Sequence, residues 1–218
     1  MKYKNKKLQI TCDGGAATGK STGAKLIAKK YRLSFLSSGL LYRYASYLII
    51  KHKPRNQISF IKRKFKSLNY RKLNKLNLHS SKISAHSAEI AKILALRNIL
   101  KRYQIKFINN NKGCVLEGRD ASTKILPKSD VKFFFICNLN IASKRRYKEL
   151  KRQSKKIKLK DVKKALFLRN KKDRSRRFSP LQKHPDAVVV DTGKLNKQAM
   201  LKKMTKHVER VLKIKYVD

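Results

Sequence analysis

The feature that most constrains the fold is a glycine-rich segment near the N-terminus. Residues 14–21 read GGAATGKS and match the pattern G-x-x-x-x-G-K-[ST]. A short apolar run over 8–12 precedes the segment and a helical pattern over 20–31 follows it, which is the strand–loop–helix setting that the pattern requires. Glycines allow backbone N–H groups to turn toward phosphate oxygens, and the N-terminus of the following helix faces them. The segment therefore predicts a loop that binds the phosphates of a nucleotide.

The side chains of this loop receive individual roles. We expect Lys20 to reach the β- and γ-phosphates and the Ser21 hydroxyl to face Mg²⁺. The predicted nucleotide-binding residues are Gly14, Gly15, Ala16, Ala17, Thr18, Gly19, Lys20, Ser21 and Thr22. The loop alone does not identify the group that accepts the phosphoryl.

Strand-like and helix-like segments alternate along the rest of the chain. The predicted strands are 8–12, 114–116, 131–137 and 187–190, and the predicted helices are 20–31, 88–108, 141–153, 160–168 and 195–213. Parallel neighbours need crossover connections, so this order predicts an α/β fold with a parallel sheet covered on both faces. Two polar stretches, 51–87 and 151–180, do not look like core and are interpreted as solvated loops or as mobile pieces that close over a substrate.

The charge of the chain limits the kind of partner. Its 218 residues contain 58 Lys and Arg against 12 Asp and Glu, a formal net charge of +46. Such a field favours an acidic substrate or a polyanion, although it says nothing about the fold. Hydrophobic residues make up 41% of the chain, which excludes a disordered tail and fits one domain.

Cysteines and apolar runs indicate the compartment. Cys12, Cys114 and Cys137 have no metal-ligand spacing and lie in apolar, strand-like runs, as expected of buried thiols in a reducing compartment. The N-terminal apolar stretch over 8–10 is too short for a signal peptide, and no apolar run approaches the length of a membrane span. The predicted location is the cytoplasm.

Four further blocks follow the glycine-rich loop in order. They are SSGLLYR at 37–43, EGRD at 117–120, RNKKDRSR at 169–176, and DAVVVDT at 186–192, which a Pro-Leu pair precedes. In this order and at these spacings, the chain resembles the bacterial cytidylate kinase family from residue 8 to about residue 204. The resemblance implies transfer of the γ-phosphoryl group of ATP to CMP or dCMP, with Mg²⁺ as the metal.

The resemblance also implies an architecture. It is a three-layer P-loop kinase fold with a parallel sheet, a small insert that binds the nucleoside monophosphate, and a lid. The expected single domain, 1–218, has a core of 1–36, 88–150 and 178–218, an insert of about 37–87, and a lid of about 151–177. The resemblance suggests a monomer.

Site residues follow from the matched blocks. The residues that the resemblance assigns to the acceptor nucleotide are Ser38, Arg43, Ser87, Arg97, Arg119, Asp120, Arg169 and Asp173. Its catalytic candidates are Lys20, Arg119, Arg174 and Arg176. Arg43 and Arg119 are expected to grip the acceptor phosphate, because guanidinium groups bind two oxygens at once. Asp120 is the expected specificity residue, since a carboxylate accepts from the exocyclic amine of cytosine and repels O4 of uracil.

The chain departs from the family pattern at several positions, and two alternative functions stay open. Ser37, Glu117 and Asn170 stand where the family commonly has Asp. One alternative is a kinase for another nucleoside monophosphate, UMP or AMP. The other is a basic P-loop protein whose main ligand is nucleic acid, but no basic patch interleaved with aromatic residues supports it, and only weak, nonspecific nucleic-acid binding at low salt is expected.

Overall fold

The computed structural model of the chain describes residues 7–152 and 157–216. Residues 1–6 lie outside the described residues, and they precede the apolar stretch that is too short for a signal peptide. Residues 153–156 of the predicted lid lie outside them as well. Among the described residues, no helix is both long and apolar enough to cross a membrane.

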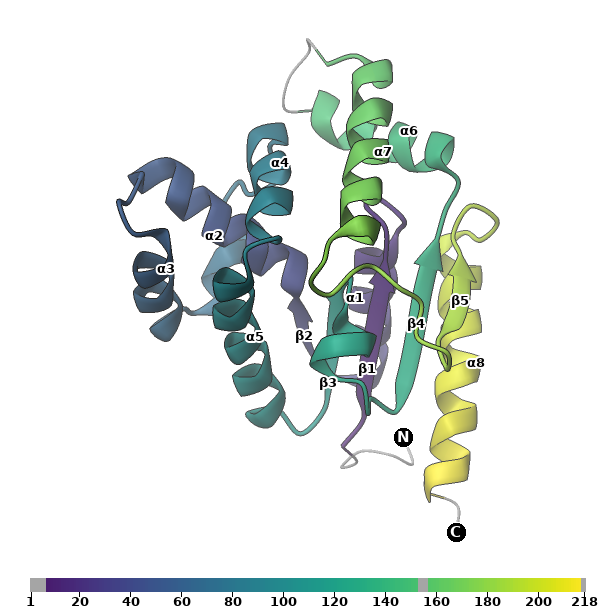
Figure 1. The fold of residues 1–218 in the computed structure, drawn as a ribbon. Helices are drawn as coiled ribbons and strands as arrows, with labels where there is room; N and C mark the ends of the chain where they lie inside the picture. The colour runs from purple at the N-terminus through teal and green to yellow at the C-terminus, as the bar shows by residue number, and fades with distance from the viewer. Residues whose placement is uncertain (1–6, 153–156, 217–218) are drawn as a thin grey trace.

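A parallel five-stranded sheet forms the centre of the molecule (Figure 1). Its strands are β1 (Gln9–Gly14), β2 (Ser34–Ser37), β3 (Cys114–Gly118), β4 (Val131–Ile136) and β5 (Val188–Asp191), in the order β2-β3-β1-β4-β5. All four neighbouring pairs are parallel, so the α/β class with a parallel sheet is confirmed. Strand β2 was not predicted, because it is only four residues long and half of it is serine.

Side chains from the two faces of the sheet enter two different hydrophobic clusters. Ile10 and Val115 pack with α1 (Lys20–Tyr31) and α8 (Lys197–Tyr216) on one face. Leu36 and Leu116 pack on the other face with α2 (Ser38–His52) and α5 (Leu94–Asn109). Because alternate residues of a strand point to opposite faces, this division produces the three layers.

Residues 51–87 form helices, so the interpretation of this stretch as solvated loops is wrong. It contains α3 (Gln57–Lys66), the 3₁₀ helix η1 (Tyr70–Lys75) and most of α4 (Ser81–Ile90). Ile61 and Phe65, one helical turn apart on α3, are buried in the same cluster as Leu73 and Leu78. A few buried side chains therefore suffice to fold a segment whose other positions are mostly polar.

Two of the predicted helices differ from the observed ones. The predicted helix over 88–108 is interrupted at 91–93, between α4 and α5. Helix α6 (Leu139–Lys151) lies close to its predicted bounds, but α7 (Leu159–Ser175) extends well beyond 160–168. Buried apolar residues of α6 and α7 form a third, small cluster with Ala16 of the glycine-rich loop.

The parallel sheet brings the sequence blocks together. Four of the blocks lie at the carboxyl ends of strands. The glycine-rich loop begins at the end of β1, Ser38 follows β2, Arg119 follows β3, and Thr192 follows β5. Carboxyl ends of parallel strands meet at one edge of the sheet, which is where open α/β sheets bind ligands. Helix α7 lies over this edge in Figure 1.

Candidate active site

The glycine-rich loop has the conformation that phosphate binding requires. Gly19 has φ +79°, a left-handed value that favours glycine, and it precedes α1 without any side-chain cap. The N–H groups of the first turn are therefore left without a capping side chain, as at helix N-termini that bind anions. Within the loop, the Thr18 hydroxyl donates to the Gly15 carbonyl at 3.0 Å. This hydrogen bond helps to fix the shape of the loop.

Lys20 lies buried between this loop and β3. Its Nζ donates to the Gly15 carbonyl at 3.0 Å and is 3.4 Å from Oε1 of Glu117. Burial, and then the nearby Arg119, lower the pKa of Lys20 to about 8. Burial opposes ionisation of Glu117, but Lys20, a hydrogen bond from Ser37 and Arg119 outweigh it and hold the Glu117 pKa below its usual value. Glu117 therefore partly balances the charge of Lys20.

A cavity of about 1080 Å³ opens beside Lys20 between the glycine-rich loop, the predicted insert and the predicted lid. The cations that line it are Lys20, Lys25, Arg43, Arg71, Arg119, Arg146, Arg152 and Arg169, and the lining acids are Glu117 and Glu149. Burial and neighbouring arginines lower the pKa of Arg43 to about 9 and that of Arg169 to about 10. The Arg169 Nε is buried, and no described residue forms a hydrogen bond with it. This excess of desolvated cations suits a ligand that carries several phosphates.

The two arginines predicted to grip the acceptor phosphate line this cavity. Arg43, on α2, donates to the Leu78 carbonyl at 3.1 Å and to the Ser84 hydroxyl at 2.5 Å. Arg119, directly after β3, donates from Nε to Asp173 at 2.9 Å. Hydrogen bonds to protein oxygens thus hold both guanidinium groups in place.

The predicted specificity residue is buried and paired. Asp120 accepts from the Arg97 guanidinium at 2.5 Å, and the side chains of both are 7% exposed. Arg97 also donates to the Ala91 carbonyl at 3.1 Å, and its guanidinium lies 5.7 Å from the centre of the Tyr42 ring. Ser87 is buried too, and its hydroxyl donates to the Ser84 carbonyl at 2.8 Å.

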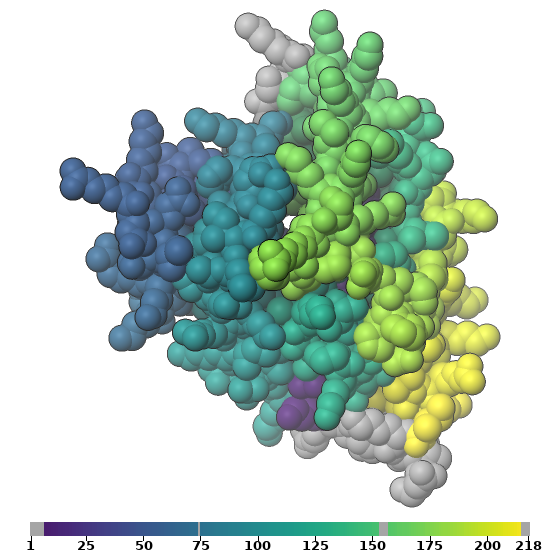
Figure 2. Space-filling model, viewed as in Figure 1, coloured from purple at the N-terminus to yellow at the C-terminus, as the bar shows by residue number. Residues whose placement is uncertain are grey.

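A chain of ion pairs joins the specificity residue to the cavity. Arg176 lies 3.9 Å from Asp120 and 3.6 Å from Asp173, which in turn binds Arg119. Arg97 and Asp120 line a separate cavity of about 410 Å³ between α5 and the segment after α7. Figure 2 shows that segment against α5 at the front of the molecule. The ion-pair chain therefore lies between two cavities, one beside the phosphate loop and one beside the specificity residue.

The remaining predicted residues lie at different depths. Ser38 is buried beside Gly118, where a Cβ would lie 2.6 Å from the Ser38 hydroxyl, so a larger residue there would displace this hydroxyl. Thr22 and Arg174 are exposed and are absent from the lining of the large cavity. The roles of Thr22 and Arg174 stay predictions.

Asn170 accepts from the Ala16 N–H at 2.9 Å, so α7 contacts the glycine-rich loop although Asn stands where the family commonly has Asp.

Sequence reasoning missed Arg146 on α6. Its guanidinium lines the large cavity and donates to the His79 carbonyl at 2.8 Å and to the Ser84 hydroxyl at 3.1 Å. Ser84 thus accepts from both Arg146 and Arg43. Arg146 follows another arginine in a basic segment, so nothing in the sequence distinguishes it.

Arg145 was missed as well, and it supports the loop from outside. Its guanidinium donates to the Thr192 hydroxyl at 2.9 Å and to the Thr192 carbonyl at 2.8 Å. The Thr192 hydroxyl is 2.8 Å from the Thr18 carbonyl and donates to it. The DAVVVDT block therefore contacts the glycine-rich loop through its last residue.

The loop fits a Mg²⁺ ion that arrives with the nucleotide. Ser21 is exposed in the first turn of α1 and lines the large cavity together with Glu117. Across residues 7–152 and 157–216, no group of three or more His, Cys, Asp or Glu is placed to hold a metal. A Mg²⁺ here would take most of its ligands from phosphate oxygens and water, as is usual for this ion in kinases.

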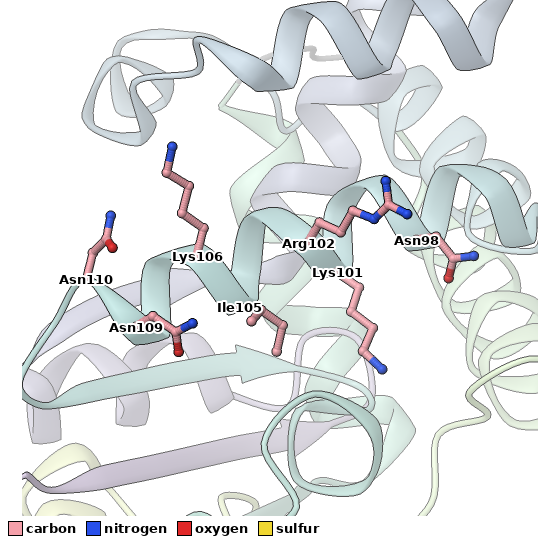
Figure 3. A pocket seen from close by; sticks show the side chains of 7 residues that line it. All are labelled: Asn98, Lys101, Arg102, Ile105, Lys106, Asn109 and Asn110. Atoms are coloured by element: carbon pink, nitrogen blue, oxygen red, sulfur yellow. The ribbon is translucent and has the colours of Figure 1, made fainter.

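A third hollow, of about 590 Å³, follows the outer side of α5 (Figure 3). Its lining residues are Asn98, Lys101, Arg102, Ile105, Lys106, Asn109 and Asn110. All belong to one helix and its C-cap, and none of them is aromatic. The hollow contains no predicted site residue and does not have the basic–aromatic pattern of a surface that binds single-stranded nucleic acid.

Comparisons with known proteins agree with the sequence blocks. The profile of the family described as Cytidylate kinase matches residues 10–210. The chain is 32% identical over 208 residues to a cytidylate kinase of Rickettsia akari, covering 94% of this chain and 93% of the relative. It is 31% identical over 201 residues to a cytidylate kinase of Rickettsia africae, covering 92% and 91%.

Solved structures agree with the fold. A protein from Thermus thermophilus superposes with a TM-score of 0.52 at 14% identity, over 95% of this chain and 98% of that one. An uncharacterized protein from Eubacterium ventriosum gives a TM-score of 0.51 at 15% identity, over 94% and 99%. At these identities the likeness concerns the fold alone.

Proposed function

The chain belongs to the cytidylate kinase family, and we infer that it transfers the γ-phosphoryl group of ATP to CMP or dCMP. The products are ADP and CDP or dCDP. The observation that carries this function is the juxtaposition of two groups of side chains. Lys20, Arg43, Arg119 and Arg169 surround one cavity, and an ion-pair chain connects Arg119 to the buried carboxylate of Asp120.

The donor nucleotide binds at the glycine-rich loop in this proposal. Backbone N–H groups of the loop and of the first turn of α1 bind its phosphates, and Lys20 leaves the Gly15 carbonyl to reach them. Mg²⁺ bound beside Ser21 would neutralise part of the phosphate charge. We propose that residues of about 151–177, which include α7, act as the lid, since α7 contacts the loop through Asn170.

The acceptor phosphate lies between Arg43 and Arg119. Both arginines line the cavity beside Lys20, so the acceptor oxygen can approach the γ-phosphorus of the donor there. That oxygen forms the new P–O bond, the bond from the γ-phosphorus to the β–γ bridging oxygen breaks, and its electron pair leaves with ADP. Lys20, Arg119 and Arg169 oppose the negative charge that spreads over the transferring group.

The cytosine base lies at Asp120 and Arg97. The carboxylate accepts from the N4 amine, and the guanidinium donates to the acceptors N3 and O2. In the described structure these two side chains bind each other, and the cavity of about 410 Å³ lies beside them. We propose that cytosine replaces this contact. Asp120 and Arg97 then each lose one hydrogen bond to the other and gain one to the base.

A panel of acceptors tests this function. ATP-dependent release of ADP would be measured with CMP, dCMP, UMP and AMP, with Mg²⁺ present and then chelated. We expect turnover of CMP and dCMP that requires Mg²⁺, and much lower turnover of UMP and AMP. Equal turnover of UMP would contradict base reading by Asp120.

Binding to nucleic acid is a separate property. We propose that the +46 charge gives only weak, nonspecific binding, which is lost by about 0.2 M salt while kinase activity remains. The monomeric state and the cytoplasmic location stay predictions.

A further inference from the structure

A buried carboxylate next to the glycine-rich loop has no part in the proposed transfer. Asp13 is the penultimate residue of β1 and is 0% exposed. One of its oxygens accepts from the Ala121 N–H at 2.9 Å. The other accepts from the Ser122 N–H at 2.7 Å and from the Ser122 hydroxyl at 2.6 Å. All of these contacts are made with the two residues that follow Asp120.

These hydrogen bonds replace one that Asp120 could make itself. Asp120 is the N-cap residue of η2 (Ala121–Ile125), and its own side chain makes no cap hydrogen bond. An aspartate at this position normally accepts from the N–H groups that follow it. Because Asp13 accepts from them instead, the Asp120 carboxylate is left to bind Arg97.

Asp13 is itself held rigidly. It pairs with Gly118 of β3 on one side and with Phe134 of β4 on the other, within the central strand of the sheet. A fixed carboxylate on the central strand therefore sets where the backbone turns after β3.

The charges around Asp13 agree with such a role. Burial raises the pKa of Asp13 to about 6, the hydrogen bonds from Ser122 and Ala121 oppose this rise, and the nearby Asp120 adds to it. The ionised carboxylate only accepts hydrogen bonds, which matches the three donors that face it.

We propose that Asp13 is a positioning residue that fixes the backbone at Ala121 and Ser122 and thereby aims Asp120 at the acceptor base. This role rests on the proposed function, because it assigns to Asp13 part of the preference for CMP over UMP. It differs from a role in donor binding, since the side-chain contacts of Asp13 are made with residues 121 and 122 and not with the glycine-rich loop.

The test is the ratio of kcat/KM for CMP to kcat/KM for UMP. We expect Asp13→Asn, which keeps the size and turns one acceptor into a donor, to lower this ratio between about tenfold and about a hundredfold, because small displacements of aligned groups have effects of this order. The KM for ATP should stay unchanged. In an Asp120→Ala background, Asp13→Asn should lower the ratio no further, since the two residues act through one contact.

Two further variants complete the experiment. Thr11→Val is the matched control: Thr11 lies two residues earlier on the same face of β1, is equally buried, and hydrogen-bonds Ser129 at 3.0 Å. It should lower thermal stability without changing the ratio. Ser122→Ala removes only the hydroxyl bond to Asp13, so it should lower the ratio about threefold. This variant carries the test if Asp13→Asn does not fold.

The outcomes separate this role from the function on which it rests. A wild-type chain without preference for CMP would overturn the proposed base reading and this role together. A wild-type preference that survives in both Asp13→Asn and Ser122→Ala would overturn the role of Asp13 alone. Equal further losses in the Asp120→Ala background would also overturn it, because Asp13 would then act independently of Asp120.

Discussion

The two ends of the candidate active site balance their charges differently. At the phosphate end, Arg43 and Arg169 line the large cavity without any ion pair among the described residues, and Lys20 faces a single carboxylate, Glu117. At the base end, Arg97 binds Asp120. Among the described residues, cations at the phosphate end thus outnumber acids, whereas the Asp120 carboxylate at the base end has two buried partners, Arg97 and Arg176.

This difference separates affinity from selectivity. Phosphates are common to all nucleotides, so unmatched cations provide binding that does not depend on the base. A buried ion pair offers oriented donors and acceptors, and a base that fails to match them leaves a buried group without a partner, which is costly. Substitutions at the phosphate end should therefore affect all acceptors, whereas substitutions at the base end should change their ranking.

Loss of Lys20 should have the largest effect. Lys20→Ala removes the buried cation beside the loop, and we expect kcat to fall by about a thousandfold or more for CMP and UMP alike. The measurement is ADP release with each acceptor at saturating ATP. Lys29→Ala is the matched control, because Lys29 is an exposed lysine on the same helix. A loss confined to CMP would contradict the assignment of Lys20 to the donor phosphates.

Loss of Arg43 should come next. Arg43→Ala leaves the acceptor phosphate with Arg119 alone, and we expect kcat/KM for CMP to fall by about a hundredfold. UMP should lose the same factor, and the KM for ATP should not change. Arg43→Lys keeps the charge but not the two-oxygen geometry, so it should recover only part of the loss. A rise in the KM for ATP would place Arg43 at the donor instead.

Substitution of Asp120 should reorder the acceptors. Asp120→Ala removes the acceptor for the N4 amine, and we expect the preference for CMP over UMP to fall by roughly tenfold to a hundredfold. Turnover of UMP should stay within about threefold of the wild-type value, since the phosphate end is intact. Parallel losses for CMP and UMP would show that Asp120 supports the fold of the site and does not read the base.

The parts of the fold that sequence predicted are those with strong local patterns. Helix α1 has the predicted bounds because a glycine-rich loop fixes its start, and β1, β3, β4 and β5 are compact apolar runs. Helix α2 was not predicted, since serine and tyrosine interrupt its apolar positions. Helix α3 is rich in basic residues and α4 in serine, so neither shows a strong apolar pattern, and tertiary burial of residues such as Ile61 on α3 and Ile90 on α4 stabilises them.

The candidate site divides in the same manner. The structure places Lys20, Arg43, Arg119 and Arg169 around one cavity, which the matched blocks made it possible to anticipate. Arg146 could not be anticipated, because it is one of 58 Lys and Arg residues and its partners at 79 and 84 are remote in sequence. The contacts of Asp13 likewise join residues that are more than a hundred positions apart.

The pH dependence should report the charge of Lys20 at the phosphate end. Lys20 must be charged to bind phosphate, and its pKa of about 8 lies within the working range. We therefore expect kcat/KM for ATP, which reports the free enzyme, to fall about tenfold per pH unit above pH 8. The same profile for CMP at saturating ATP should stay flat through pH 8, because bound phosphate raises the Lys20 pKa. A flat ATP profile up to pH 9.5 would contradict the lowered pKa.

The effect of Lys20 on stability has the opposite sign. Its folded pKa of about 8 lies below its usual value of 10.5, so between these values the unfolded chain binds more protons than the folded one. Stability contributed by this group should therefore rise with pH across that window, while activity falls. Denaturant unfolding of the ligand-free protein at pH 8 and pH 10, compared with Lys20→Met, would measure this contribution.

The smallest effect is expected for an ion pair that is exposed to solvent. Glu89 of α4 binds Lys172 of α7 at 2.7 Å and Lys92 at 2.7 Å, and the first of these contacts joins α4 to the predicted lid. Hydrogen bonds from Lys172 and then Lys92 lower the Glu89 pKa to about 2, but the side chains are about half exposed and solvent screens the pairs. We expect Glu89→Gln to lower the free energy of unfolding by less than about 1 kcal/mol, and the difference should vanish near 0.5 M salt. Turnover of CMP should change less than about twofold, because neither the phosphate end nor the base end of the site is altered. A tenfold loss of kcat at unchanged stability would instead make this exposed contact a third functional region, one that couples α4 to the predicted lid.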